Sequence, residues 1–271
     1  MPYNCDRIRQ ADCRNHLLAS LPAEVFARLA GYLRRVKLNL EEILYEPRET
    51  VHTVYFPTQS MVSLVQVMED GSTIEAGVVG HSGIVGYAAY LGGNNSISRA
   101  IVQIPGPAIA LDADICKAEF ERHGALHDLL LSYSQALLTQ VSQTAACNRF
   151  HLIEERLARW LLLSQDASQA AHLKLTQGFL SSMLGSRRAS VTLAAGRLQQ
   201  AGLIRYGRGE IEILDRENLE LAACECYAAV RSEYLRLLGA SSDDPAARTP
   251  DPANRCSRSM TSGSRRHSAF P

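Results

Sequence analysis

The stretch from Leu173 to Leu214 constrains the fold most, because it reads as helix, glycine turn, helix and hairpin. A first helix is expected after Thr176, which is a good N-cap residue, and Gly185 is expected to end it in the left-handed conformation. Ser186 predicts the N-cap of a second helix that runs to about residue 200.

The hairpin follows directly. Gly202 is expected to close the second helix, and the turn 206–209 is expected to join a strand that begins near residue 203 to a partner strand over 211–214. This order of elements is that of a winged helix-turn-helix.

The charge of this block points to a phosphate-bearing partner. No acidic residue lies between Asp166 and Glu210, although the whole chain is formally neutral. A local basic stripe on a neutral protein is the electrostatic signature of nucleic-acid binding. Its positive residues are Lys174, Arg187, Arg188, Arg197, Arg205 and Arg208.

The second helix would enter the major groove N-terminus first. Arginine there can bind guanine, Ser and Thr can bind phosphate or base, and Val191 could touch a thymine methyl. The start of the first helix would fix the register on phosphates, and the wing would reach the flanking backbone. The residues expected at DNA are Thr176, Gln177, Arg187, Arg188, Ser190, Val191, Thr192, Arg197, Arg205, Tyr206 and Arg208. The alternative is a small helical core with a solvated basic face.

At 271 residues the chain is long enough for two domains of about 100–200 residues each. No apolar run approaches the roughly 18 residues that span a bilayer, and the N-terminus lacks the apolar segment of a signal peptide. We therefore expect a cytoplasmic protein whose seven cysteines are reduced.

Short β-type runs separated by turn signals fill residues 36–111 and predict a barrel, sandwich or roll. The strongest strand pair is a hairpin of 61–68 with 73–78. Glycines recur at 77, 80, 83 and 86, which indicates bends where the backbone passes close to a ligand or a neighbouring strand. We favour the neighbouring strand.

Residues 125–177 contain no Gly or Pro, which permits a long helix over about 126–149. Three- and four-residue steps along it predict a seam for a partner helix, although packing within one subunit would produce the same pattern. The expected dimer seam is Leu130, Tyr133, Leu137, Val141, Thr144 and Asn148.

A further amphipathic helix is expected over 153–163 and a closing helix over 217–238. The fold class is therefore α+β: an N-terminal β-roll of the jelly-roll kind, a long helix and a C-terminal winged helix-turn-helix. The expected domains are a flexible N-terminus (1–16), a β-roll sensor (17–124), a dimerisation helix (125–150), a winged helix-turn-helix (151–238) and a disordered tail (239–271).

We expect no metal, cofactor or catalytic site. Cys224 and Cys226 are expected on one helix, where their side chains would point about 200° apart. Cys5 and Cys13 alone cannot supply the thiolates of an iron–sulfur cluster, although Cys116 or Cys147 could join them. Residues 80–83 show part of a nucleophile elbow without its final glycine, so a hydrolase acting through Ser82 is only a minor hypothesis.

A β-roll, a long helix and a winged helix-turn-helix in this order resemble the Crp/Fnr superfamily of bacterial transcription regulators. The resemblance covers about residues 17–236 and is most specific in 155–161 (ERLARWL) and 175–214. It implies a homodimer on a palindromic promoter site, with an effector sensed in the β-roll. Double-stranded DNA and a second copy are the implied partners, and RNA polymerase is a further candidate.

The sequence departs from this family in two places. Where cyclic-nucleotide members have Gly-Glu and later Arg-Ser, this chain has Gly86-Tyr87 and Ser98-Arg99, so we expect an effector other than cyclic AMP, or none. These four residues mark the expected effector pocket. In the second helix Arg188 keeps a family arginine. Ala189 and Leu193 replace the Glu and Arg that are frequent in the family, so the preferred DNA site is expected to differ.

The main functional prediction is thus a homodimeric, sequence-specific DNA-binding regulator. The alternative is a sensor for a cyclic nucleotide or another small molecule, whose basic domain does not read DNA sequence.

Overall fold

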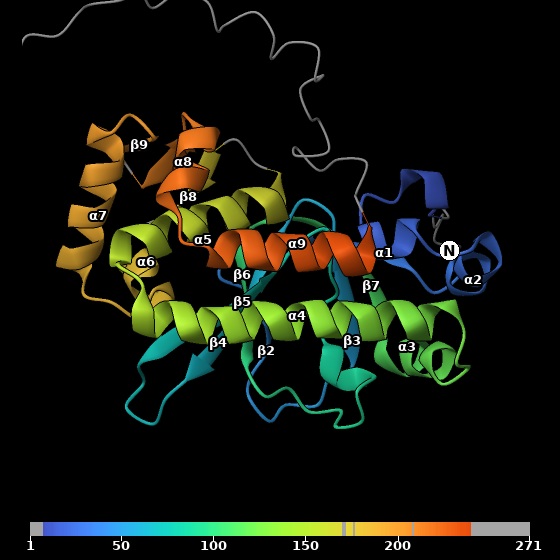
Figure 1. Ribbon diagram of the computed structural model, residues 1–271. Coiled ribbons are helices and arrows are strands. Elements are labelled where there is room, and N and C mark those ends of the chain that lie inside the picture. Colours follow the sequence, from blue (N-terminus) through green and yellow to red (C-terminus); the bar gives the residue numbers. More distant parts are fainter. Residues whose placement is uncertain (1–7, 170–171, 176, 208, 240–271) are drawn as a thin grey trace, which may run out of the picture. The chain divides into compact units, whose positions relative to one another are not determined.

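The computed structural model describes residues 8–169, 172–175, 177–207 and 209–239. It confirms the predicted α+β class (Figure 1). The strands are β1 (Arg34–Leu38), β2 (Ile43–Tyr45), β3 (Thr53–Pro57), β4 (Met61–Val67), β5 (Thr73–Val79), β6 (Arg99–Ile104), β7 (Gly106–Asp112), β8 (His172–Lys174), β9 (Ile204–Gly207) and β10 (Glu210–Ile213). The helices are η1 (Gln10–Asp12), α1 (His16–Ala19), α2 (Ala23–Leu29), η2 (Tyr87–Ala89), α3 (Ala113–Phe120), α4 (Ala125–Phe150), α5 (Ile153–Ser168), α6 (Gln177–Met183), α7 (Arg188–Gln200), α8 (Arg216–Ala222) and α9 (Cys226–Leu238).

Two antiparallel sheets form the N-terminal β-roll, with strand orders β1-β7-β3 and β2-β6-β4-β5. The predicted hairpin is confirmed, because β4 pairs with β5 from Val62↔Val79 to Val67↔Thr73. Strand β1 was not predicted. That strand lies at a sheet edge and exposes charged side chains such as Arg34 and Arg35, which is how edge strands avoid aggregation and which hides the apolar pattern.

The long helix is also confirmed: α4 runs from Ala125 to Phe150. Helix α9 packs along it in the opposite direction (Figure 1). The Gln140 amide donates to the Tyr234 hydroxyl at 3.3 Å, and the rings of Tyr133 and Tyr234 meet edge to face at 6.5 Å. One face of α4 is therefore covered by α9 of the same chain.

The closing helix predicted over 217–238 is wrong as a single element. The chain forms α8 and α9 instead, and extended backbone at Ala223 separates them. Cys224 and Glu225 therefore lie outside the regular helices, and Cys226 is the first residue of α9.

Three of the four recurring glycines, Gly77, Gly80 and Gly83, lie against helices. The interpretation that a neighbouring strand lies against them is therefore wrong at these three positions. A Cβ atom on Gly77 would meet Gln140 of α4 at 2.6 Å, and one on Gly83 would meet the Tyr133 hydroxyl at 2.7 Å. A Cβ atom on Gly80 would meet the backbone of Ala167 of α5 at 2.4 Å. The missing side chains thus let α4 and α5 approach the β-roll closely.

The β-roll and the helix-turn-helix region share a hydrophobic core. Met61, Val65 and Val78 of β4 and β5 belong to the same buried cluster as Trp160 of α5. Beside this cluster, the buried Glu75 carboxylate accepts hydrogen bonds from Trp160 Nε1 at 2.8 Å and from Ser63 Oγ at 2.5 Å. Burial raises the pKa of Glu75 to about 7.

Candidate nucleic-acid interface

The helix-turn-helix forms from α6, a glycine turn and α7, as predicted. Gly185 has φ 55°, a left-handed conformation that favours glycine. A Cβ atom there would lie 2.9 Å from Ile74 Cδ1 of β5, so the Ile74 side chain would have to shift. The predicted N-cap is wrong by one residue. Helix α7 is preceded by Arg187, and the Ser186 hydroxyl donates back to the Leu184 carbonyl at 3.3 Å.

Helix α7 has one buried and one exposed face. Its buried residues are Val191, Ala194, Ala195 and Leu198. Val191 is 0% exposed, so the expectation that it touches a thymine methyl is wrong: it belongs to the core. Thr192 is exposed and Ser190 is half-buried. Leu193 is 66% exposed and lies on the face available to a partner, although it was not predicted as a contact.

Two arginines at the start of α7 carry the free positive charge of this face. Arg187 and Arg188 are exposed, and neither forms an ion pair with any carboxylate in the part of the chain that the structure describes. The guanidinium of Arg188 lies over Gly178 of α6, where a Cβ atom would be 2.5 Å from Nη2. Glycine at 178 therefore makes room for Arg188 against α6.

Acidic residues from outside the acid-free segment neutralise two of the other predicted contacts. Arg197 pairs with Glu154 of α5, and Arg205 pairs with Glu212 of β10 at 2.5 Å. Both arginine side chains remain 69% exposed. Absence of acids along a sequence segment thus does not ensure absence of acids around it in space.

The wing is a three-stranded sheet in the order β8-β10-β9, of which β8 was not predicted. The pairing of β9 with β10 confirms the predicted strand pair, but the turn predicted at 206–209 is wrong at its first two positions, because Tyr206 and Gly207 belong to β9 and pair with Ile211 and Glu210. Leu214 lies beyond β10. Gln199 of α7 accepts from the Tyr206 backbone N–H at 2.7 Å. Burial raises the pKa of Tyr206, which also lies beside Gln177 at the start of α6. Thr176 and Arg208 lie outside the described residues.

A partly buried link joins the long helix to the helix-turn-helix. Arg156 of α5 donates to Asn148 Oδ1 of α4 at 2.8 Å and also to the Leu184 carbonyl in the glycine turn. A movement of the end of α4 can therefore reach the turn between α6 and α7 through one side chain.

The predicted dimer seam faces largely inward. Leu130, Tyr133, Leu137 and Thr144 are buried within their own chain, and Asn148 bonds to Arg156. Val141 is half-buried, and its side chain lies within 3.6 Å of the position that a Cβ atom on Gly77 would take. The alternative of packing within one subunit therefore describes most of these residues.

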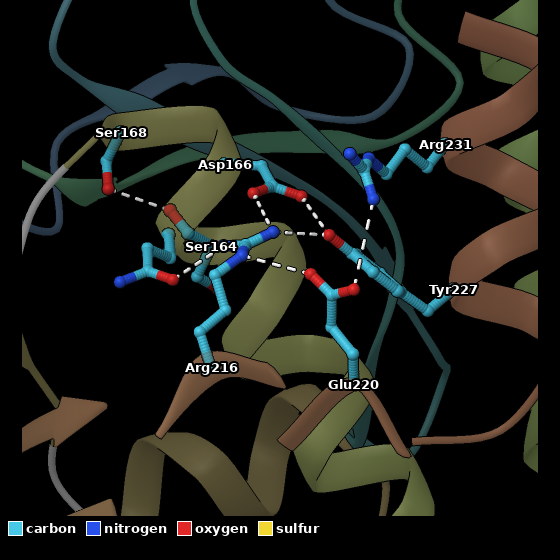
Figure 2. Close-up of polar contacts among 8 residues, drawn as sticks. Ser164, Asp166, Ser168, Arg216, Glu220, Tyr227 and Arg231 are labelled. Atoms are coloured by element: carbon cyan, nitrogen blue, oxygen red, sulfur yellow. Dashed lines mark hydrogen bonds and ion pairs between the residues drawn. The ribbon is translucent and has the colours of Figure 1, made fainter. Parts of the chain in front are cut away.

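Helices α8 and α9 are tied to α5 by a polar network (Figure 2). Arg216 pairs with Asp166 at 2.7 Å and with Glu220 at 3.0 Å, and its guanidinium also donates to the Tyr227 hydroxyl. The Tyr227 hydroxyl in turn donates to Asp166 at 2.8 Å. Burial raises the pKa of Asp166, and the charge of Arg216 opposes this shift. The network fixes α8 and the first turn of α9 on α5.

The expected effector pocket is crowded by the protein's own side chains. A Cβ atom on Gly86 would meet Tyr45 and Val51 at 3.1 Å. Arg99 is paired with Glu46 at 3.0 Å, so its charge is already compensated. Ser98 is 2% exposed and adjoins Tyr87, whose pKa is raised by burial.

Ser82 donates to or accepts from its neighbour His81 at 3.2 Å and lies in a turn after β5, away from any strand-to-helix junction. In the described part of the chain, no helix combines the length and the low polarity that crossing a membrane requires.

Comparison with known proteins agrees with this architecture. Residues 155–222 match the model of the Crp-like helix-turn-helix domain. FixK2 from Bradyrhizobium japonicum has a similar structure, with a TM-score of 0.58 and 16% identity over 71% of this chain and 98% of that chain. A transcriptional regulator of the Crp family from Thermus thermophilus also gives 0.58, with 22% identity over 70% and 96%. No similar sequence is found among curated proteins.

A β-roll joined by a long helix to a winged helix-turn-helix defines a class of two-part DNA-binding proteins. Residues 155–222 form a Crp-like helix-turn-helix domain, and the chain has the fold of Crp/Fnr-type transcription regulators.

Proposed function

We propose that the protein is a homodimeric regulator that recognises a symmetric promoter site through α7. The observation that carries the proposal is the position of Arg187 and Arg188, exposed and without carboxylate partners among the described residues, at the N-terminal end of α7. A recognition helix presents this end to base edges in the major groove. Arginine there is the side chain best suited to bind guanine through two hydrogen bonds.

A second copy would dock on the face of α4 that α9 leaves open. Leu131 is 43% exposed and Leu138 is 63% exposed, and Ala145 continues the same face seven residues later. A seven-residue apolar repeat is the pattern of paired helices. The proposed seam thus lies on a different face of α4 from the one predicted from sequence.

The proposal includes an effector other than cyclic AMP, or none. The pairing of Arg99 with Glu46 supports this, because an arginine already compensated by a carboxylate is a poor site for a cyclic phosphate. The regulator CLP from Xanthomonas campestris, which is described as responsive to c-di-GMP, shares the fold at 15% identity and a TM-score of 0.57. That likeness concerns the fold and assigns no ligand to this chain.

Sequence-specific binding is tested by selecting genomic fragments with the full-length protein and then measuring affinity for a selected and a scrambled duplex at fixed salt. We expect Arg188→Ala to reduce the difference in binding free energy between the selected and the scrambled duplex by about 1–3 kcal/mol, because one bidentate base contact is lost. Lys174→Ala, on the exposed β8 strand, is the matched control and should weaken both duplexes alike.

If wild-type protein binds both duplexes equally at about 0.15 M salt, the alternative of a sensor module without sequence recognition is correct. Equal affinity ratios for wild type and Arg188→Ala would remove Arg188 from the reading surface.

A further inference from the structure

Three cysteines and one histidine from distant parts of the chain meet at the base of α4. We call Cys147, His151, Cys224 and Cys226 the cysteine–histidine cluster; their ligand atoms all lie within 4.8 Å of one another. Cys147 and His151 are one helical turn apart at the end of α4, whereas Cys224 lies in the break between α8 and α9 and Cys226 begins α9. All three cysteines are buried and His151 is half-buried.

The break between α8 and α9 explains why sequence reasoning dismissed these residues. On one continuous helix, Cys224 and Cys226 would point in nearly opposite directions. Because the helix stops at Ala222 and restarts at Cys226, the two thiols converge on the same point. The prediction that the side chains of Cys224 and Cys226 point about 200° apart is therefore wrong.

The spacing of the donor atoms suits a single metal ion. The sulfurs of Cys147 and Cys224 are 3.5 Å apart, and Cys226 Sγ is 3.5 Å from His151 Nδ1. Tetrahedral zinc with bonds of about 2.3 Å to sulfur places its ligand atoms about 3.5–3.8 Å apart. A disulfide requires about 2.05 Å between the sulfurs, so Cys147 and Cys224 are two free thiols.

The surroundings of His151 match those of a metal ligand. Its other ring nitrogen, Nε2, lies 3.2 Å from the carboxylate of Glu225. A metal-bound histidine commonly donates its second N–H to a carboxylate, which fixes the tautomer and orients the ring. With Nε2–H directed to Glu225, Nδ1 presents its lone pair to the three sulfurs.

Two arginines next to the cluster provide an independent observation. Arg159 is 6% exposed and donates to the Thr144 hydroxyl at 2.9 Å, with no ion pair to a carboxylate among the residues described. The Nε atoms of Arg156 and Arg159 both lack a hydrogen-bond partner in the described part of the structure. The charge of Arg159 is close enough to interact with the thiols of Cys147 and Cys226.

A buried cation is costly unless a negative group accompanies it. The Glu75 carboxyl is near enough for Arg159 to lower its pKa, but burial still raises that pKa to about 7 and the two groups form no ion pair among the residues described. Zn²⁺ bound by three thiolates and a neutral imidazole carries a net charge of −1 and would add compensation for Arg159. Binding would release the thiol protons to solvent as the three S–Zn bonds form.

We propose that the cysteine–histidine cluster binds one Zn²⁺ as a closed tetrahedral site. Four protein ligands with no open position make the site structural. It fastens the end of α4 to the start of α9, and so holds α9 on α4 next to the Arg156 link to the helix-turn-helix.

The test is the metal content of the full-length chain, purified without a polyhistidine tag and under reducing conditions. We expect about one zinc per chain by mass spectrometry of the metal, and X-ray absorption should report three sulfur neighbours and one nitrogen. Cobalt substitution should give the visible spectrum of a tetrahedral thiolate complex. Cys224→Ser should lose the metal, and Cys116→Ser should keep it, because Cys116 is buried in the β-roll core away from the cluster.

Glu225→Gln keeps all four ligands and tests the proposal even if a cysteine variant fails to fold. It should weaken zinc affinity by about ten- to a hundredfold in competition with a chelator. The proposal is overturned if wild-type protein neither retains zinc nor takes it up saturably. It also fails if Cys224→Ser binds zinc as wild type does, if iron is bound instead, or if Cys147 and Cys224 form a disulfide in the metal-free chain.

Discussion

Glu75 shows how a single buried group connects the β-roll to the DNA-binding unit. Its carboxylate is held by Trp160 of α5 and Ser63 of β4, and burial raises its pKa to about 7. In the unfolded chain the ordinary pKa is 4.5. Between these two pH values the folded protein keeps a proton that the unfolded chain has lost, so the free energy of unfolding falls as pH rises through this window.

Glu75→Gln removes this titration while keeping an acceptor for Trp160 Nε1. We expect the variant to be more stable than wild type at pH 8 by roughly 2–4 kcal/mol, because one pKa unit corresponds to about 1.4 kcal/mol. The difference should shrink toward pH 5, as chemical denaturation at several pH values would show. Glu69→Gln, at an exposed position in the adjacent hairpin turn, controls for the substitution. A variant whose advantage is the same at pH 5 and pH 8 would contradict this account.

At the scale of single residues, periodicity predicted which face of α7 is buried, but it could not show which of its residues contact DNA. The stripe that includes Val191 and Leu198 is buried as its spacing indicates, so Val191 could not also be a base contact. The partners of Arg197 and Arg205 could not be predicted, because Glu154 and Glu212 lie outside the acid-free segment and reach it only through folding.

At the scale of elements, the exposed face of α4 leads to a prediction about the oligomeric state. Leu138→Arg places a charge at the centre of the proposed seam and should convert a dimer to a monomer, because a buried unpaired charge costs several kcal/mol. Sedimentation velocity measures the change. Leu221→Arg, at an 82% exposed position on α8, should leave the dimer intact. A monomeric wild type, or a dimeric Leu138→Arg protein, would exclude this face as the seam.

Most helices and strands could be predicted because their patterns are local. The hairpin of β4 and β5, the long helix α4 and the helix-turn-helix all lie where the sequence analysis placed them. The strands missed were the charged edge strand β1 and the three-residue strand β8. The break at Ala223 was missed because no Gly or Pro marks it, and the cysteine–histidine cluster was therefore missed too. The spacing Cys147-x₃-His151 was the local signal available.

The packing of the β-roll against the DNA-binding unit depends on contacts that are distant in sequence. Trp160, the chain's one tryptophan, lies in the core that Met61 and Val78 share with α5. Contacts of this kind produce no periodic pattern in the sequence, so they could not be predicted from it. The glycine at 80 did mark a close approach, but the sequence could not show that Ala167, 87 positions later, was the neighbour.

This shared core predicts that the protein unfolds as one unit. In a denaturant titration, Trp160 fluorescence reports the shared core, and far-UV circular dichroism reports all helices and strands. We expect the two transitions to coincide at a given protein concentration. Two separated steps would show instead that the β-roll and the winged helix-turn-helix are independent folding units.

The contact between His16 Nε2 and the Leu238 carbonyl, 2.7 Å apart, brings the beginning and the end of the described fold together. Helix α9 runs antiparallel to α4 and ends beside α1, so the two ends of the described fold are in contact. Displacing α9 would therefore disturb two places at once: the C-terminal end of α4, which is linked through Arg156 to the turn before α7, and helix α1, which precedes the β-roll.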